Sequence, residues 1–440
     1  MRRTKKTYHR LKSLTAALSF SLLFCSVSPA LSATVGTETF KEVDPELLFT
    51  QGMESRLEGR LYSSIDDFKK ILEQYPELHR ARLELAVSYY NTFNFEGALR
   101  EAQTVLDEPD IPPNVRVAIL AFMAQVKKDQ ERFTLSGDWQ FPVMIGYMHD
   151  SNVSAGPDSR AISGYPGFTL DDEDTENSDS AWNFNGGVEH VLQTGKYFRF
   201  GEQPASLLWK SKINIYHRAY FDEHDYNLTV YTFRTGPALL STGNWRASLD
   251  LQEEVIRYGG EDLADYTSLI PQFTWYFENG IELGAECLFT HRSYAQDEDT
   301  NRTGDYISPQ ISVGYVTKDN KFAVQGHAAF FNEDAKATRK SNDGYNLFLG
   351  GSWNFLANTS LLALVNYRDT EYDGREPLFN KARDEDEWRS TLGIRHTFKD
   401  MGAATDWSIG ANITYTDHES NVSIYEYDRT QVSLYLQHRF

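Results

Sequence analysis

The residues with the most reactive side chains are not grouped in a catalytic or metal-binding pattern. The 11 histidines are scattered along the chain, and the two cysteines, Cys25 and Cys287, lie far apart. The sequence contains no G-x-S-x-G nucleophile turn, no H-E-x-x-H zinc motif and no glycine-rich phosphate loop. We therefore expect no catalytic residue, no metal site and no cofactor, and we predict that the protein is not an enzyme.

The charge of the chain is strongly acidic. The formal net charge is −20, from 43 Lys and Arg against 63 Asp and Glu. Binding to nucleic acid requires a basic surface, so we exclude nucleic acid as a partner. The densest acidic run, Asp171-Asp172-Glu173-Asp174, could bind cations weakly, but we interpret it as a solvated loop.

Residues 1–33 are expected to be a secretory signal peptide. Basic residues between Arg2 and Lys12 precede an apolar stretch from Leu14 to Val27, which is too short to anchor the chain in a membrane. Three cleavage positions remain open, after Ala30, Ser32 or Ala33. The signal predicts export across the inner membrane of a bacterium.

Residues 44–133 are predicted to form a helical domain related to tetratricopeptide repeats. A 34-residue period relates Pro45 to His79, and Pro76 closes the first repeat. A further helix over 114–131 would cap this short stack. Such repeats form a groove, and we expect this one to dock a substrate or a periplasmic chaperone. Its candidate lining residues are Arg80, Leu83, Val87, Tyr90 and Asn91. The alternative is that they form a scaffold face without a ligand.

Residues 139–440 change to a period of two, which indicates strands with one apolar face. We expect fourteen strands, at 140–149, 181–193, 206–220, 226–240, 244–257, 265–277, 281–294, 305–316, 321–332, 344–356, 360–371, 386–398, 405–417 and 426–440. Short connections alternate with long acidic ones, as in the periplasmic turns and extracellular loops of outer-membrane barrels. The predicted fold is therefore two-domain α+β, with helical repeats followed by a 14-stranded antiparallel transmembrane β-barrel.

The last predicted strand has the features of an outer-membrane insertion signal. Its apolar residues alternate with polar ones and end in an aromatic residue at the last position; they are Val432, Leu434, Leu436 and Phe440. Outer-membrane barrels typically end in this way, and the barrel insertion machinery recognises the pattern, so we expect that machinery as a partner. His438 departs from the pattern. The direction of the strands then predicts that the helical domain and Phe440 both lie in the periplasm.

The opposite face of the strands is expected to line the barrel lumen. The candidate lumen residues are Arg246, Glu254, Glu282, Glu286, Arg389, Arg395 and Arg439. Aromatic residues near strand ends suit the interfacial girdles of a membrane protein; they include Tyr216, Tyr220, Tyr276, Trp388 and Trp407. Pro271 and Pro309 lack a backbone donor, so we predict a β-bulge at each.

A short motif stands where the helical domain meets the barrel. It comprises Gly146, Tyr147, Asp150, Ser151, Asn152 and Val153. Together with the order of signal, short repeats and a barrel ending in Phe, this G-Y-x-x-D-S-N-V stretch resembles the surface lipoprotein assembly modifier (Slam) family over essentially the whole mature chain. The resemblance implies an outer-membrane translocator whose substrate is a surface lipoprotein or a related secreted protein.

Two other functions remain open from the sequence. A polysaccharide export porin also joins helical repeats to a barrel, and an acidic lumen would suit a cationic sugar polymer, although such porins usually have many more repeats. The third possibility is a passive diffusion channel or a barrel enzyme.

Overall fold

The computed structural model describes residues 44–440, apart from 110, 134–136, 163–164, 166, 168, 172–173, 298, 400–401 and 403–404. The predicted signal peptide lies outside the described residues. Five helices come first: α1 (Pro45–Leu57), α2 (Leu61–Gln74), α3 (His79–Asn91), α4 (Phe95–Leu106) and α5 (Pro113–Phe133). Among the described residues, none of the helices has the length and apolar character needed to cross a bilayer.

The helices pack as successive pairs around an aromatic core. Phe68 of α2 is fully buried, and its ring meets the ring of Phe49 edge to face at 5.6 Å. Gly52 permits this approach, because a Cβ atom there would lie 3.0 Å from the Phe68 ring. Asn94 caps α4 by accepting a hydrogen bond from the Gly97 backbone N–H at 2.9 Å. The small and aromatic positions are consistent with tetratricopeptide repeats, which stay a prediction.

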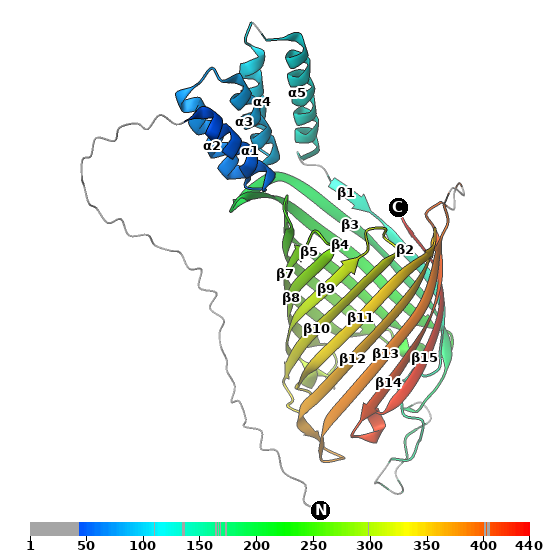
Figure 1. Ribbon diagram of the computed structural model, residues 1–440. Coiled ribbons are helices and arrows are strands. Elements are labelled where there is room, and N and C mark those ends of the chain that lie inside the picture. Colours follow the sequence, from blue (N-terminus) through cyan, green and yellow to red (C-terminus); the bar gives the residue numbers. More distant parts are fainter. Residues whose placement is uncertain are drawn as a thin grey trace, which may run out of the picture. The chain divides into compact units, whose positions relative to one another are not determined.

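The strands follow in one continuous antiparallel sheet (Figure 1). They are β1 (Gly137–Gln140), β2 (Pro142–Asp150), β3 (Asp179–Phe200), β4 (Gln203–Tyr220), β5 (Leu228–Ser241), β6 (Trp245–Tyr258), β7 (Glu261–Tyr276), β8 (Ile281–Tyr294), β9 (Gly304–Val316), β10 (Phe322–Ala335), β11 (Asn342–Leu356), β12 (Thr359–Glu376), β13 (Lys381–Thr397), β14 (Ser408–Ser420) and β15 (Tyr427–Arg439). Short 3₁₀ turns lie at His224–Tyr226, Thr300–Arg302 and Ser423–Tyr425.

The sheet closes on itself, because β15 pairs with β2 from Gln431↔Asp150 to Arg439↔Pro142. β1 and β2 pair with β3 in one register and are separated only at Phe141, before Pro142, which has no N–H to donate. They therefore form a single wall strand, and the barrel has fourteen strands, as predicted. We call the end with the β3–β4 turn and Phe440 the turn end, and the end with residues 151–178 the loop end.

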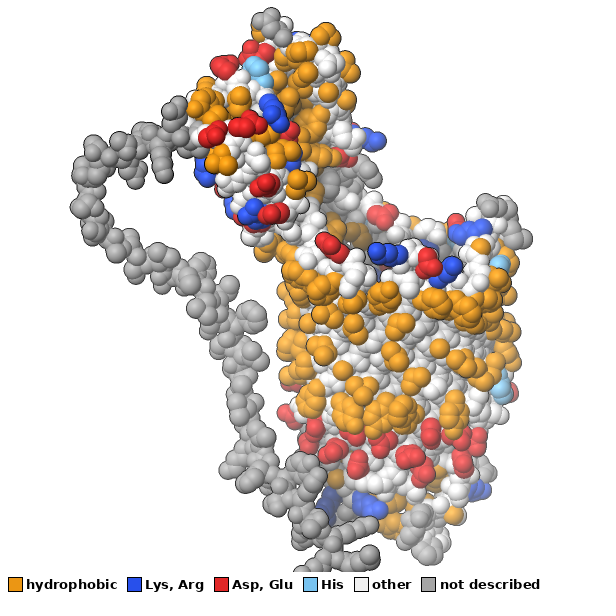
Figure 2. All heavy atoms as spheres, in the orientation of Figure 1, with side chains coloured by type: hydrophobic (Ala, Val, Ile, Leu, Met, Phe, Trp, Pro, Cys, Tyr) orange, Lys and Arg blue, Asp and Glu red, His pale blue; other side chains and the backbone are white. Residues whose placement is uncertain are grey.

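The outer surface of the barrel carries a continuous apolar band (Figure 2). Large side chains on alternate residues of each strand are exposed there, for example Ile311 at 67%, Leu392 at 63% and Leu349 at 60%. A soluble protein would bury so much apolar surface, so this band is the surface that faces lipid.

A belt of carboxylates borders the apolar band on the loop-end side (Figure 2). These side chains point outward, in register with one another on neighbouring strands; the facing pairs are Asp343↔Glu371, Asp369↔Asp386, Glu371↔Asp384, Asp386↔Glu419 and Asp417↔Asp428. Two connections that we expected to be long, 332–343 and 372–385, are shorter than predicted. The reason is that β10 to β13 continue as paired strands beyond the apolar band.

The predicted β-bulges at Pro271 and Pro309 are wrong. Pro271 pairs with Leu249 of β6 without a register shift. The backbone pairing is interrupted only on the side of β8, and it resumes there in the same register. Pro309 pairs with Cys287 of β8, and the ladder lapses on its β10 side. Next to that lapse the Ser308 hydroxyl donates to the Phe330 carbonyl at 3.1 Å, so a side chain replaces part of the missing ladder. A proline can therefore sit in a barrel wall without an extra residue.

Candidate functional site

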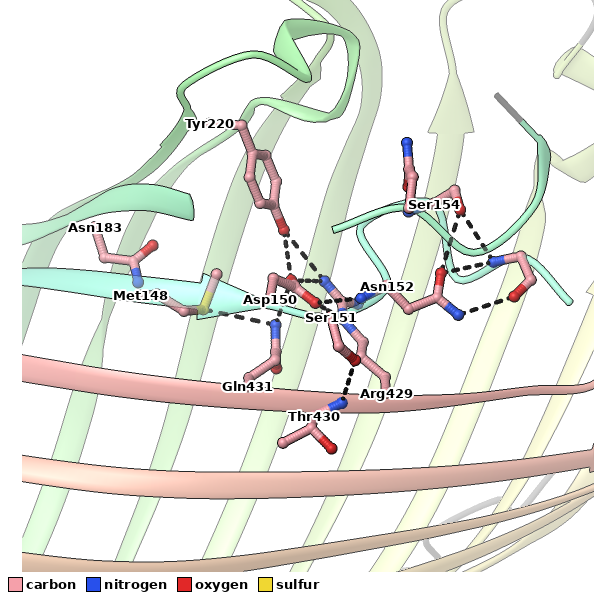
Figure 3. A network of polar contacts seen from close by, with 12 residues as sticks. Met148, Asp150, Ser151, Asn152, Ser154, Asn183, Tyr220, Arg429, Thr430 and Gln431 are labelled. Carbon is pink, nitrogen blue, oxygen red and sulfur yellow. Dashed lines mark hydrogen bonds and ion pairs between the residues drawn. The ribbon is translucent and has the colours of Figure 1, made fainter. Parts of the chain in front are cut away.

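A buried polar network joins the first and last wall strands at the loop end of the barrel (Figure 3). Asp150, the last residue of β2, has no exposed surface. Its carboxylate accepts hydrogen bonds from Arg429 Nε at 2.8 Å and from Gln431 Nε2 at 2.8 Å, both on β15. It also pairs with Arg429 Nη2 and accepts from the Tyr220 hydroxyl at 2.7 Å. We call Asp150, Tyr220, Arg429 and Gln431 the seam cluster.

The residues after Asp150 turn the chain away from the wall while holding it to β15. The backbone N–H of Ser151 donates to the Thr430 carbonyl at 3.0 Å, and the Thr430 N–H donates to the Ser151 hydroxyl at 2.9 Å. Asn152, also without exposed surface, donates from Nδ2 to the Gly156 and Asp428 carbonyls at 2.8 and 3.0 Å. The D-S-N run therefore holds the end of β2 to β15 through both side-chain and backbone hydrogen bonds.

The other motif residues pack around this network. Val153 is buried with Met148 and Tyr220 in a small apolar cluster. Tyr147 points outward and its hydroxyl lies 2.9 Å from the Ser180 hydroxyl. Gly146 lies against β15, where a Cβ atom would approach the Leu434 carbonyl oxygen to 3.0 Å. The motif thus fits β2 against β15 and β3.

Three members of the seam cluster were not among the candidate site residues. Arg429 and Gln431 share the inward face of β15 with Arg439, so their period-two spacing could have indicated them. Tyr220 was assigned to an interfacial girdle, which is wrong, because the side chain is 2% exposed and bonded to Asp150. Its position on the same strand face as Lys212 and Asn214 could have placed it in the lumen.

The candidate lumen residues lie on the inward face of their strands and fall into separate groups. Arg246, Glu282 and Glu286 lie at the turn end of β6 and β8, and Arg246 and Glu286 line a cavity of about 550 Å³. Arg395 and Arg439 line another of about 500 Å³, in which Arg439 pairs with Glu189 at 3.0 Å. A third cavity of about 460 Å³ lies at the loop end; its lining includes Arg389, Glu387, Arg368 and His418. Glu254 faces Tyr266 of β7 and lines none of these cavities.

The inward-facing charges largely neutralise one another. Asp250, 1% exposed, pairs with Arg234 at 2.6 Å and with Lys210 at 3.3 Å. Further inward pairs are Lys212–Glu189, Arg292–Glu333, Arg383–Glu385 and Arg389–Glu387. The lumen wall is therefore polar and contains many ion pairs, and further rows of carboxylates stand on the outside.

The candidate groove residues of the helical domain all lie on α3 and make different contacts, and their role in docking stays a prediction. Arg80 stacks on the Phe49 ring at 4.0 Å, and Leu83 packs against the second apolar cluster of the domain. Tyr90 and Asn91 line a separate cavity of about 390 Å³ together with Phe93 and Phe95. The Tyr90 hydroxyl donates to Asp129 at 2.6 Å, and this hydrogen bond raises the pKa of Tyr90. Val87, on α3, is not among the residues lining that cavity.

The C-terminal strand has the alternation that the sequence predicts. Val432, Leu434, Leu436 and Phe440 are 44%, 55%, 43% and 62% exposed and face outward. His438, which departs from the apolar pattern, stacks on Trp407 at 4.9 Å and meets Phe440 edge to face at 4.2 Å. An imidazole thus takes the place of an apolar ring within an aromatic cluster.

One group of possible metal ligands stands outside the barrel. Glu77, His79 and Glu108 have ligand atoms within 4.8 Å of one another, at the ends of helices. The group is partly exposed, and His79 Nδ1 is a buried atom with no hydrogen-bond partner among the described residues.

The closed fourteen-strand sheet, its apolar outer band and its polar lumen define an outer-membrane β-barrel. The chain is similar to a surface lipoprotein assembly modifier of Pasteurella multocida (strain Pm70). The two are 21% identical over 323 residues, covering 70% of this chain and 59% of the relative. Residues 289–439 match a family model described as a protein of unknown function, DUF2860. These matches and the barrel fit a Slam-like outer-membrane protein.

Solved outer-membrane barrels also align with the strand domain. A loop-deletion mutant of OmpT of Vibrio cholerae is 8% identical, covers 69% of this chain and 99% of its own, and has a TM-score of 0.39. The channel DcaP of Acinetobacter baumannii is 11% identical, with 70% and 98% covered and a TM-score of 0.38.

Proposed function

We propose that the protein moves a surface lipoprotein, or a related secreted protein, across the outer membrane to the cell surface. The observation that carries the proposal is the match to the Pasteurella surface lipoprotein assembly modifier over 70% of this chain. A barrel of fourteen strands is wider than one that side chains alone can fill, and its lumen contains cavities of about 500 Å³ and more. The path would run through this lumen or along its wall.

In this proposal the helical domain lies in the periplasm and docks the substrate or its chaperone. Support comes from contacts between α2 and the β3–β4 turn. The backbone N–H of Ser63 donates to the Glu202 carboxylate at 2.8 Å, and that of Leu61 donates to the Glu202 carbonyl at 3.2 Å. A substrate held by the helices would then be near the turn end of the lumen. Folding of the substrate outside the cell would supply the driving free energy.

The charge distribution favours this function over export of a cationic polysaccharide. Such a polymer would need unpaired carboxylates along its path, and several inward carboxylates, among them Asp250 and Glu333, are already paired with arginines. Rows of carboxylates also lie on the outer surface, away from such a path (Figure 2). A passive channel or a barrel enzyme would leave the helical domain without a role.

The test is co-expression with a candidate surface lipoprotein in a Gram-negative host that lacks both proteins. Protease treatment of whole cells should remove the lipoprotein only when the full chain is present. A chain without residues 44–133 should insert normally and display much less lipoprotein. Equal display with and without the helical domain would contradict its docking role, and no display with the full chain would contradict the proposed function.

A further inference from the structure

The first wall strand continues past the end of its neighbour at the turn end of the barrel. Phe440 is the last residue that pairs on the β15 side, through mutual backbone hydrogen bonds with Phe141 at 3.0 and 3.2 Å. β1 continues for four residues beyond Phe141, still in register with β3 from Gln140↔Glu189 to Gly137↔Leu192. Among the described residues, β3 is the only strand that pairs with β1, which lies beside the C-terminus in Figure 1.

The direction of the free backbone groups follows from the alternation of an antiparallel ladder. The N–H and C=O of one residue point to the same neighbour, and those of the next residue point to the other. Because Phe141 bonds to the β15 side, Trp139 and Gly137 must also point to that side, where no strand formed by the described residues lies opposite them. Two backbone N–H groups and two C=O groups therefore have no strand partner in the described part of the chain, and they stand in line with the β2–β15 ladder.

This open edge has one aromatic face. The Trp139 ring stacks on His190 of β3 at 4.1 Å, which fixes β1 against the wall. Trp139 and Phe141 are 56% and 44% exposed on the same outward face, and Phe440 beside them is 62% exposed. Asp138 and Gln140 share the other face and bond to each other at 3.2 Å. A strand that alternates apolar and polar residues would match both faces, as β15 matches β2.

We propose that β1 is a docking edge for an extended segment of the transported polypeptide, which adds as an antiparallel strand in line with β15. The identity of this occupant rests on the proposed function. Addition of a strand to an exposed edge gives affinity through main-chain hydrogen bonds and specificity through alternate side chains. A preformed edge lowers the conformational entropy lost on binding. The segment would thereby be held against the barrel wall at its turn end.

The direct test is amide hydrogen exchange of the full-length protein in lipid nanodiscs. The probe is a synthetic peptide with the β15 sequence, compared with a peptide of the same composition but without the alternation. The β15 peptide should slow exchange in 137–141, and the shuffled peptide should not. If neither peptide changes exchange there, the inference is overturned, whether or not the protein transports anything.

Variants at one position separate the backbone edge from the side chain. Trp139→Pro removes a backbone N–H donor from the open edge and leaves the hydrogen bonds between β1 and β3 intact. It should therefore lower the affinity for the β15 peptide by about fivefold more than Trp139→Ala does. In the co-expression assay, Trp139→Pro should likewise reduce lipoprotein display more than Trp139→Ala. If the two variants display equal amounts of lipoprotein although they differ in affinity for the β15 peptide, the edge takes no part in transport. Absence of display with the native chain would contradict the proposed function alone.

Discussion

The seam cluster predicts that the buried carboxylate of Asp150 contributes much more to barrel stability than an exposed ion pair at the other end of β15. Asp150→Asn keeps the shape of the side chain but removes its charge. The Arg429 guanidinium, only 16% exposed, would then lack its carboxylate partner. Removal of one partner from a buried ion pair costs about 3–5 kcal/mol. We expect the free energy of unfolding to fall by that amount.

Arg439→Met provides the matched control at the other end of β15. Arg439 and Glu189 are 58% and 25% exposed, and exposed pairs contribute about 0–1 kcal/mol. The assay is urea unfolding of the refolded protein in lipid vesicles, followed by tryptophan fluorescence. The double variant Asp150→Asn, Arg429→Met should recover part of the loss, because it removes the unpaired charge as well. Equal losses for Asp150→Asn and Arg439→Met would refute the role of the buried network.

Three further predictions follow from burial and strand direction. Leu392→Arg places a charge on the lipid face and should destabilise the barrel by about 2–4 kcal/mol in urea unfolding, whereas Thr391→Arg on the lumen face should cost much less. Phe68→Ala empties the centre of the helical core and should destabilise that domain by about 3–5 kcal/mol, seen as earlier loss of helical circular dichroism while the heat-resistant barrel band in gels is unchanged. Cys287 faces outward on β8, so a lipid-soluble maleimide should label it and a charged one should not; rapid labelling by the charged reagent would contradict the strand direction.

The barrel could be predicted from the sequence because the residues of each strand alternate between a lipid-facing and a lumen-facing side. Alternation along fourteen segments, with one apolar face, gave the number of strands and most of their positions. The same alternation continues beyond the lipid, where carboxylates such as Asp369 and Asp386 replace apolar residues. Because these acidic residues were expected to lie in loops, the predicted ends of several strands fall short of the observed ones.

The seam cluster could not be predicted from the sequence, because its members meet only through the register of distant strands. Asp150 lies 70 residues from Tyr220 and 279 from Arg429. Strand faces limit the candidates to inward residues, but the relative stagger of β2, β4 and β15 decides which of them touch. The motif could be recognised, whereas its partners could not.

The groove residues of the helical domain were chosen from the repeat pattern alone. That pattern gives the helix faces, but the packing of Phe49 and Phe122 decides which side chains of α3 remain exposed to solvent. Arg80 covers the Phe49 ring, and Tyr90 meets Phe122 at 5.8 Å. The two residues therefore pack on different aromatic rings of the same helical core.

The central claim is a closed barrel whose first and last wall strands pair in the register described above. It is tested most directly by cysteines at Met144 and Gln437, which face each other across the seam inside the lumen, in a Cys287→Ser background. Oxidation in outer-membrane vesicles should form a disulfide between them, visible as altered migration in a non-reducing gel. A pair at Ile145 and Gln437, one residue out of register and on opposite faces, should form none. Absence of the first disulfide, or equal formation of both, would contradict the closed barrel.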